Sequence, residues 1–241
     1  MTQAERERDV FEAFAEAAPF SVLPDSIESR SPPEPDILCE IEGIGKVGFE
    51  LTELIDQSYM ARIGLLFKTK QLLTNYWKNE LDIEDSSLFS KKYKGALLHF
   101  EYPPDSKLKE RKSVAKIAFT KLLKLPDNSS GEVLKNDTDL APILNWVNIS
   151  RLDLAEIIVD TSSYGYLGDP TAPAIKKKLK KKYKCNYPIE LLAHINWGIM
   201  PHEEVWLASA QQASSQIFMS PFRKIWVFDN TDKKIKYEYT L

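Results

Sequence analysis

Two short apolar segments joined by a glycine-containing turn are the feature that most constrains the fold of this chain. Residues 36–41 and 47–54 are rich in apolar side chains, and the five residues between them include Gly43 and Gly45. Glycine adopts the backbone conformations of tight turns at little steric cost. Apolar runs bounded by such turns are typical of paired strands. We therefore predict a hairpin in which residues 36–41 pair with residues 47–54.

Elsewhere, segments with helical spacing of apolar residues alternate with short apolar runs. The sequence predicts helices at 3–18, 58–80, 107–123, 174–184 and 203–215, and strands at 26–30, 95–102, 155–160, 189–196, 225–228 and 235–239. This alternation is typical of an α/β fold, in which helices cover both faces of a central mixed β-sheet. We expect a single α/β domain over residues 1–241, with a core at 1–125 and a C-terminal α/β extension at 140–241.

Composition excludes several classes of protein. The formal net charge is −3, so a nucleic-acid contact would have to come from a local basic patch. Cys39 and Cys185 are far apart in the sequence, so neither a disulfide framework nor a zinc site is indicated. A run of about 18 apolar residues is absent, and the first residues are highly charged. This predicts no membrane span and no signal peptide, hence a cytoplasmic protein.

Two carboxylates lie on the predicted hairpin. Asp36 begins its first strand, and Glu50 shares one face of the second strand with Gly48 and Thr52. These small neighbours leave room beside Glu50, so we expect the two carboxylates to bind one Mg²⁺ or Mn²⁺ ion, with the Leu51 carbonyl as a third ligand. Such a site supports metal-assisted phosphodiester hydrolysis. In the alternative interpretation, Asp36 caps a turn and Glu50 pairs with a lysine.

The order of elements adds to this interpretation. A helix, a short strand, a strand starting at Pro35-Asp36, a strand containing Glu50, a helix and a further strand follow one another over residues 1 to about 102. This order resembles the PD-(D/E)XK nuclease superfamily. The resemblance implies a restriction-endonuclease-like core that hydrolyses nucleic acid, with Mg²⁺ held by Asp36 and Glu50. It also implies a lysine two residues after Glu50 that orients the attacking water.

Thr52 occupies the position of that lysine, which leaves the enzymatic activity open. Possible replacements are Lys46 in the turn, Lys68 and Lys70 on the next helix, and Gln71, which orders water without a charge. The superfamily often adds a glutamate from the preceding helix, and Glu12 is the preferred candidate over Glu16. The resemblance thus implies a catalytic set of Asp36, Glu50, Thr52 and Glu12.

Seven lysines lie between positions 176 and 184, around Ile175, Leu179 and Tyr183. The three apolar residues are spaced four apart and form a narrow stripe on a helix. The lysines can be a solvated face or a phosphate-binding surface, and the absence of acidic partners puts phosphate binding on about equal terms with a solvated face. Binding to nucleic acid would then depend steeply on salt. The predicted contact residues are Lys176, Lys177, Lys180, Lys181 and Lys184.

Three functions remain open from the sequence. The first is a metal-dependent nuclease, and the second a catalytically degenerate nucleic-acid-binding or regulatory protein on the same fold. The third is a protein-interaction module. A second copy of the chain also stays open as a partner, whereas a membrane is not predicted. His99 lies close to Glu101 on a predicted strand, where a structural histidine is favoured over an acid–base catalyst.

Overall fold

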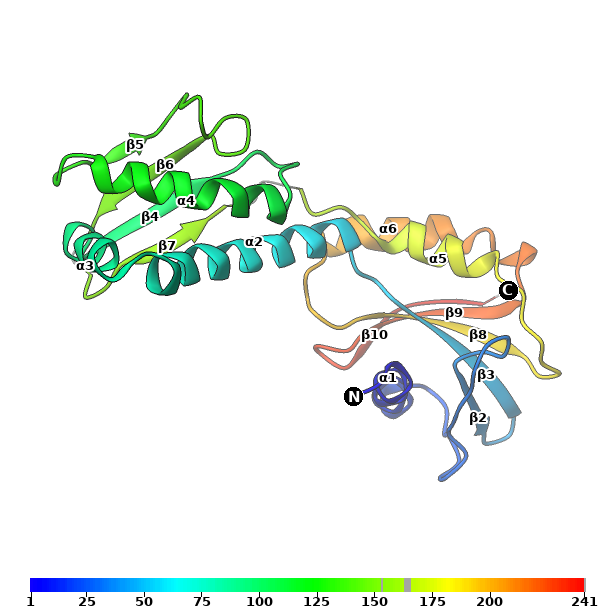
Figure 1. The fold of residues 1–241 in the computed structure, drawn as a ribbon. Coiled ribbons are helices and arrows are strands. Elements are labelled where there is room, and N and C mark those ends of the chain that lie inside the picture. Colours follow the sequence, from blue (N-terminus) through cyan, green and yellow to red (C-terminus); the bar gives the residue numbers. More distant parts are fainter. Residues whose placement is uncertain (153, 163–165, 241) are drawn as a thin grey trace. The chain divides into compact units, whose positions relative to one another are not determined.

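A computed structural model describes residues 1–152, 154–162 and 166–240. The chain divides into two compact units, each with its own sheet (Figure 1). The buried apolar residues form two clusters in the first unit and one in the second. Met1–Asp56 and the segment from Leu167 onward make the first unit, and Gln57–Tyr166 make the second. Both units combine helices with a mixed β-sheet, so the predicted α/β class is confirmed.

The first unit has a six-stranded sheet in the order β1-β2-β3-β8-β9-β10. Its strands are β1 (Glu28–Ser29), β2 (Ile37–Ile41), β3 (Gly45–Glu53), β8 (Ile189–Ile195), β9 (Phe222–Asp229) and β10 (Lys234–Thr240). Its helices are α1 (Gln3–Ala17), α5 (Thr171–Leu179), α6 (Glu203–Ser214) and the 3₁₀ turn Ile217–Met219. The predicted hairpin is present as the antiparallel pair β2–β3. Strand β3 then pairs in parallel with β8, and β8 with β9.

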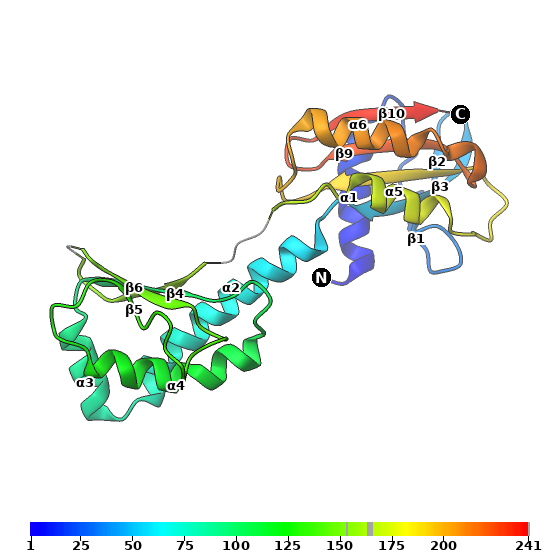
Figure 2. The same ribbon diagram turned by 90° about the horizontal axis from the view of Figure 1, so that it is seen from above.

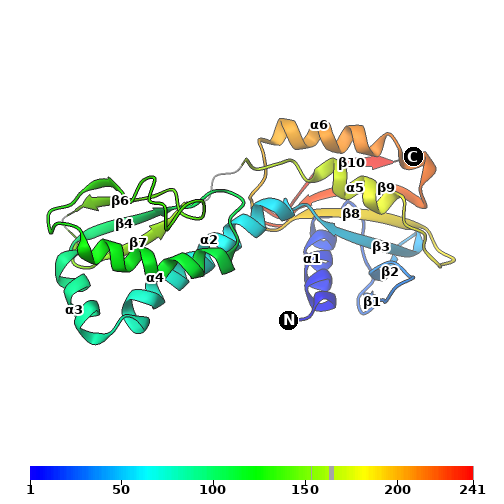
Figure 3. The ribbon, with the colours of Figure 1, turned by 45° about the horizontal axis from the view of Figure 1, so that its top comes forward.

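Helices cover both faces of this sheet. Helix α1 lies on one face, and α5 and α6 lie on the other (Figures 2 and 3). Helix α1 buries the rings of Phe11 and Phe14 against Phe49, with ring centroids 4.9 and 5.8 Å apart. In strand β8, Leu191 packs toward α5 and α6, whereas Leu192 packs toward α1. This alternation decides which helices meet the side chain of each residue on β3 and β8.

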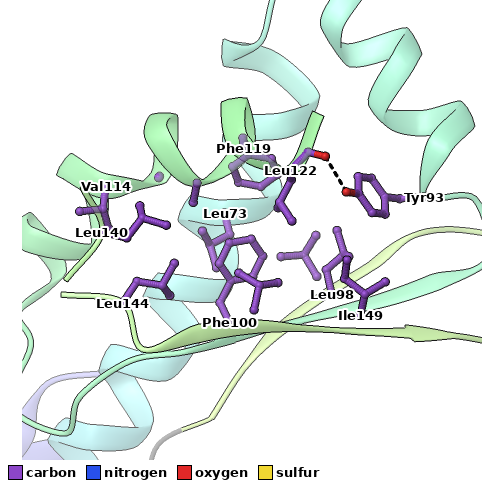
Figure 4. Packing of buried hydrophobic residues seen from close by; sticks show 14 of the residues in the cluster. Leu73, Tyr93, Leu98, Phe100, Val114, Phe119, Leu122, Leu140, Leu144 and Ile149 are labelled. Atoms are coloured by element: carbon purple, nitrogen blue, oxygen red, sulfur yellow. Dashed lines mark hydrogen bonds between the residues drawn. The ribbon is translucent and has the colours of Figure 1, made fainter. Parts of the chain in front are cut away.

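The second unit has a four-stranded sheet in the order β5-β6-β4-β7. Its elements are α2 (Gln57–Asn75), a π-helical turn (Tyr76–Glu80), α3 (Ile83–Lys92), β4 (Ala96–Glu101), α4 (Leu108–Lys124), β5 (Gly131–Val133), β6 (Trp146–Arg151) and β7 (Ile158–Thr161). Side chains from α2, α3 and α4 pack with the sheet into one core (Figure 4). Within it, the Tyr93 hydroxyl donates a hydrogen bond to the Leu122 carbonyl at 2.7 Å.

The two sheets change the grouping that the sequence predicted. The strand expected at 95–102 is β4, and it belongs to the second sheet, whereas Asp36 and Glu50 belong to the first unit. Residues 1–125 and residues 140–241 each contribute strands to both sheets. The helix and strand that follow β3 within its own unit are therefore α5 and β8. Residues 1–125 therefore do not share one sheet, as the predicted restriction-endonuclease-like core would require.

The second unit is inserted in the first between β3 and α5. At the junctions, the backbone N–H of Gly168 donates a hydrogen bond to Asp56 Oδ2 at 2.7 Å. The points where the chain leaves and re-enters the first unit are thus held together. Among the described residues, none of the helices is long and apolar enough to span a membrane.

Candidate active site

Strands β2 and β3 bring Asp36 and Glu50 together. The register pairs Ile37 with Phe49, so one further step places Asp36 opposite Glu50 where the paired region ends. Residues opposite each other in an antiparallel pair lie on the same face of the sheet. Asp36 Oδ2 accepts a hydrogen bond from the Leu51 N–H at 2.8 Å, which fixes this carboxylate beside β3.

Glu50 is fully buried and is held by two lysines from the α5 region. Its Oε1 accepts hydrogen bonds from Lys178 Nζ at 2.5 Å and from Lys181 Nζ at 2.9 Å. Its Oε2 is also buried but has no hydrogen-bond partner among the described residues. Lys178 lies in the last turn of α5, and Lys181 follows the end of that helix. The parallel pairing of Glu50 with Leu191 explains this contact, because Leu191 faces α5.

A tyrosine completes the surroundings of Glu50. The Tyr183 hydroxyl is buried and finds no hydrogen-bond partner in the described part of the chain. Burial, the charge of Glu50 and a side-chain interaction with Glu50 raise the pKa of Tyr183 above its usual value. The buried oxygens of Tyr183 and Glu50 Oε2 therefore lie close enough to interact, although neither forms a well-shaped hydrogen bond with a described residue. A bound water or ion would satisfy such atoms.

The surroundings also shift the ionisation of Asp36. Burial, and then the charge of Glu50, raise the pKa of Asp36 from 3.8 to about 6. The hydrogen bond from Leu51 and the charge of Lys178 oppose this rise without cancelling it. The side chains of Asp36, Glu50 and Lys178 thus act on one another electrostatically.

These residues fit a divalent cation that prefers oxygen. Glu50 Oε2 forms no well-shaped hydrogen bond within the described part of the chain, and Asp36 directly precedes the adjacent strand β2. No cluster of three or more His, Cys, Asp or Glu side chains suited to a metal occurs in the described ranges. Mg²⁺ commonly uses one or two carboxylates and completes its shell with water and substrate phosphate, so two carboxylates suffice. The Leu51 carbonyl stays a predicted ligand.

Other residues of the predicted catalytic set lie as follows. Thr52 is half-buried and pairs with Ala193, one step along the Glu50 face. Glu12 forms an ion pair with Arg8 at 2.8 Å, on the exposed side of α1. The α1 carboxylate whose charge contributes to the raised pKa of Asp36 is Glu7. Glu7 makes the smallest of these contributions, and α1 covers the face of the sheet opposite to the one from which Glu50 meets α5.

Lys178 is a residue of this site that sequence reasoning did not single out. Lys178 holds Glu50, whereas Lys46 is exposed and pairs with Glu40 across β2–β3. The other proposed replacements, Lys68, Lys70 and Gln71, belong to α2 in the second unit, where Lys70 forms an ion pair with Asp160 at 3.3 Å. The sequence signal for Lys178 is that it directly precedes Leu179, a member of the apolar stripe on the helix predicted at 174–184.

The lysine-rich helix predicted at 174–184 ends earlier than expected, because α5 ends at Leu179. Of the five predicted contact residues, Lys181 is engaged by Glu50. The other four form no ion pair with a described residue, and three of them are exposed: Lys177, Lys180 and Lys184. Together with Lys182, these exposed lysines surround the segment that carries Lys181. We call Lys180, Lys181, Lys182 and Lys184 the lysine connector.

His99 belongs to the second unit and is part of a hydrogen-bonded group. Its Nε2 lies 3.1 Å from Ser162 Oγ and 3.4 Å from Glu101 Oε2, and Ser162 also donates to Glu101. Among the described residues, the bonds that reach the ring are to Nε2, and none of these residues places a carboxylate on Nδ1, as a serine triad does. This arrangement fits the structural role favoured from the sequence.

Comparisons of the chain with protein-family models, with curated proteins and with solved structures give no match. The function proposed below is therefore argued from the site itself.

The ionisation of Asp36 gives a first prediction. In the native state its pKa is raised, so the native protein binds more protons than the unfolded chain between about pH 4 and pH 6, and stability falls as pH rises through this range. Asp36→Asn removes the free-energy cost of ionising this partly buried carboxyl group. We expect it to raise the free energy of unfolding by roughly 2 kcal/mol above pH 7 and by little at pH 4. Urea denaturation in EDTA at both pH values measures this. Asp9→Asn, at an exposed position of α1, is the control, and equal effects of Asp36→Asn at the two pH values would contradict the assignment.

Gly48 gives a second prediction, because the side chains around it leave no room for a methyl group. A Cβ at this position would lie 2.7 Å from Tyr187 Cε2 and 2.9 Å from Pro35 Cγ. Gly48→Ala must therefore displace Pro35, the residue before Asp36, and we expect a loss of about 1 to 3 kcal/mol in stability. Thermal and urea denaturation measure this loss. Gly64→Ala, where nothing lies within 4 Å, is the matched control and should not destabilise. If Gly48→Ala were as stable as the wild type, Pro35 and Tyr187 would have to move aside without a free-energy cost.

Proposed function

We propose that the first unit is a metal-dependent phosphodiesterase acting on nucleic acid, with Asp36, Glu50 and Lys178 as its catalytic residues. The observation that carries the proposal is the buried Glu50 carboxylate beside Asp36: its Oε1 is held by lysine, and its Oε2 forms no well-shaped hydrogen bond with any residue that the structure describes. A carboxylate pair and a lysine are the groups that the resemblance to the PD-(D/E)XK superfamily implies. Here the lysine would come from α5 instead of position 52.

The order of elements within the first unit supports the same proposal. Helix α1 is followed by β1, β2, β3, α5 and β8, with the second unit inserted before α5. A helix, three strands in antiparallel succession, a helix and a strand parallel to the third follow the order from which the resemblance was inferred. A restriction-endonuclease-like core thus becomes a proposal for residues 1–56 together with those from 167 onward.

Each residue has a defined part in the proposed reaction. Asp36 and Glu50 would hold Mg²⁺, which when bound supplies Lewis acidity toward a water molecule and the phosphate. The Lys178 ammonium is anchored by Glu50 in a site that is largely shielded from solvent. It is therefore positioned to donate a hydrogen bond to the attacking water or to a phosphate oxygen, where charge develops. The exposed lysines of the lysine connector would bind the nucleic-acid backbone.

The proposal is tested with the intact chain and labelled single-stranded DNA, duplex DNA and RNA. Cleavage of at least one substrate is expected with Mg²⁺ or Mn²⁺ and not with EDTA. Titrations of binding at two salt concentrations, with and without Mg²⁺, accompany the assay. An absence of cleavage in every combination would remove the enzymatic proposal.

One observation favours a second candidate function. In the structure Glu50 is already paired with two lysines, as expected for a site that has become a structural ion pair. A catalytically degenerate protein of this kind would bind nucleic acid in a salt-sensitive and metal-independent way, without cutting it. No binding at either salt concentration would point instead to a protein-interaction module.

A further inference from the structure

The carboxylate site of the first unit carries its own counter-charges. Asp36 and Glu50 supply two carboxylates, and Lys178 and Lys181 supply two ammonium groups bonded to Glu50 Oε1. When all four groups are ionised, the site has no net charge. A neutral site attracts a divalent cation weakly, because the repulsion from the lysines offsets the attraction to the carboxylates. Metal affinity should therefore change when either lysine leaves.

The two lysines differ in how easily they can leave. Lys178 is part of α5, and its side chain is 21% exposed. Lys181 lies beyond the last residue of α5, and its side chain is 39% exposed. Lys181 is also flanked by Lys180 and Lys182, which are exposed and make no ion pair with a described residue. The positive charge of these lysines attracts a phosphate to the segment that contains Lys181, the more exposed of the two lysines paired with Glu50.

We propose that Lys181 binds nucleic-acid phosphate and, in the absence of nucleic acid, pairs with Glu50, so that phosphate and divalent metal bind the site cooperatively. When the Lys181 side chain moves from Glu50 to a bound phosphate, one positive charge leaves the neighbourhood of the carboxylates. Glu50 then attracts a cation more strongly, and a bound cation in turn releases Lys181 for phosphate. Such coupling is reciprocal by thermodynamic necessity. This inference rests on the proposed function for the identity of the anion, but it does not require hydrolysis.

The test measures metal binding rather than activity. Mn²⁺ is titrated into the full chain by electron paramagnetic resonance, with and without a short phosphorothioate DNA, used both single-stranded and as a duplex. We expect at least one DNA form to tighten Mn²⁺ binding to the wild-type chain by about 10-fold or more, within the usual range of such couplings. Lys181→Ala should bind Mn²⁺ more tightly than wild type without DNA, and DNA should change its affinity much less.

Lys234→Ala is the control, because it removes an exposed lysine charge from β10, outside the lysine connector, and should keep the wild-type coupling. Circular dichroism of each variant checks that the fold is retained. Equal Mn²⁺ affinity with and without DNA, or equal behaviour of Lys181→Ala and Lys234→Ala, would overturn the inference. Coupling without cleavage would refute the proposed hydrolysis and support this inference. Metal-dependent cleavage without coupling would support the proposed hydrolysis and refute this inference.

Discussion

The Glu50→Gln and Asp36→Asn variants are expected to lose metal-dependent cleavage of nucleic acid, each by on the order of 10³-fold or more. Both replacements keep the shape of the side chain and remove the negative charge that would hold the metal. A bound metal contributes several kcal/mol of transition-state stabilisation, and each 1.4 kcal/mol corresponds to about 10-fold in rate. Initial rates with saturating substrate and Mg²⁺ measure the loss.

Asp36→Asn also separates catalysis from folding. Because burial and Glu50 raise the pKa of Asp36, this variant should be more stable than wild type at neutral pH. A variant that is more stable and yet inactive cannot owe its inactivity to unfolding. Cleavage that persists in both Asp36→Asn and Glu50→Gln would refute the carboxylate site, and would indicate another active site or a contaminating nuclease.

Lys178→Ala is expected to lower the cleavage rate by about 10² to 10³-fold with little change in the binding of nucleic acid. The ammonium of Lys178 lies 2.5 Å from Glu50 Oε1 and is only 21% exposed, so its charge acts in a poorly solvated site. Removing one such group from a preorganised site typically costs this much in rate. Single-turnover rates and equilibrium binding, measured on the same preparations, distinguish a catalytic effect from a binding effect.

Lys177→Ala is the control for Lys178. It removes the neighbouring charge of α5 from an exposed position, so it should weaken binding slightly and leave the single-turnover rate unchanged. Lys178→Arg retains the charge but not the compact ammonium, so its rate should lie between those of wild type and Lys178→Ala. If Lys178→Ala cleaved at the wild-type rate, another group would have to replace the motif lysine.

The β2–β3 hairpin could be predicted because the information for it is local. Gly43 and Gly45 have positive φ values of 73° and 91° in the turn, and apolar residues fill both strands. The alternation of residues on β3 also gave the correct face for Glu50 and Thr52 relative to Phe49. The pairing of two adjacent strands needs no knowledge of distant parts of the chain.

The contact between Glu50 and Lys178 could not be predicted in the same way. The inserted unit Gln57–Tyr166 separates these residues in sequence, and nothing in its composition marks where it begins. Helix α2 follows β3 directly and therefore took the place of α5 in the predicted core. The apolar spacing of α2 also does not tell which of its residues are buried, since Phe67 is 61% exposed.

The hydrogen bond between Asp56 and Gly168 has a consequence for how such a chain can change over time. Because this bond joins the two ends of the first unit between which residues 57–166 are inserted, both ends of the insertion start from one place. An insertion anchored in this way can be lengthened, trimmed or exchanged while the strands beside it keep their alignment. The two units are therefore expected to accumulate sequence changes independently of each other.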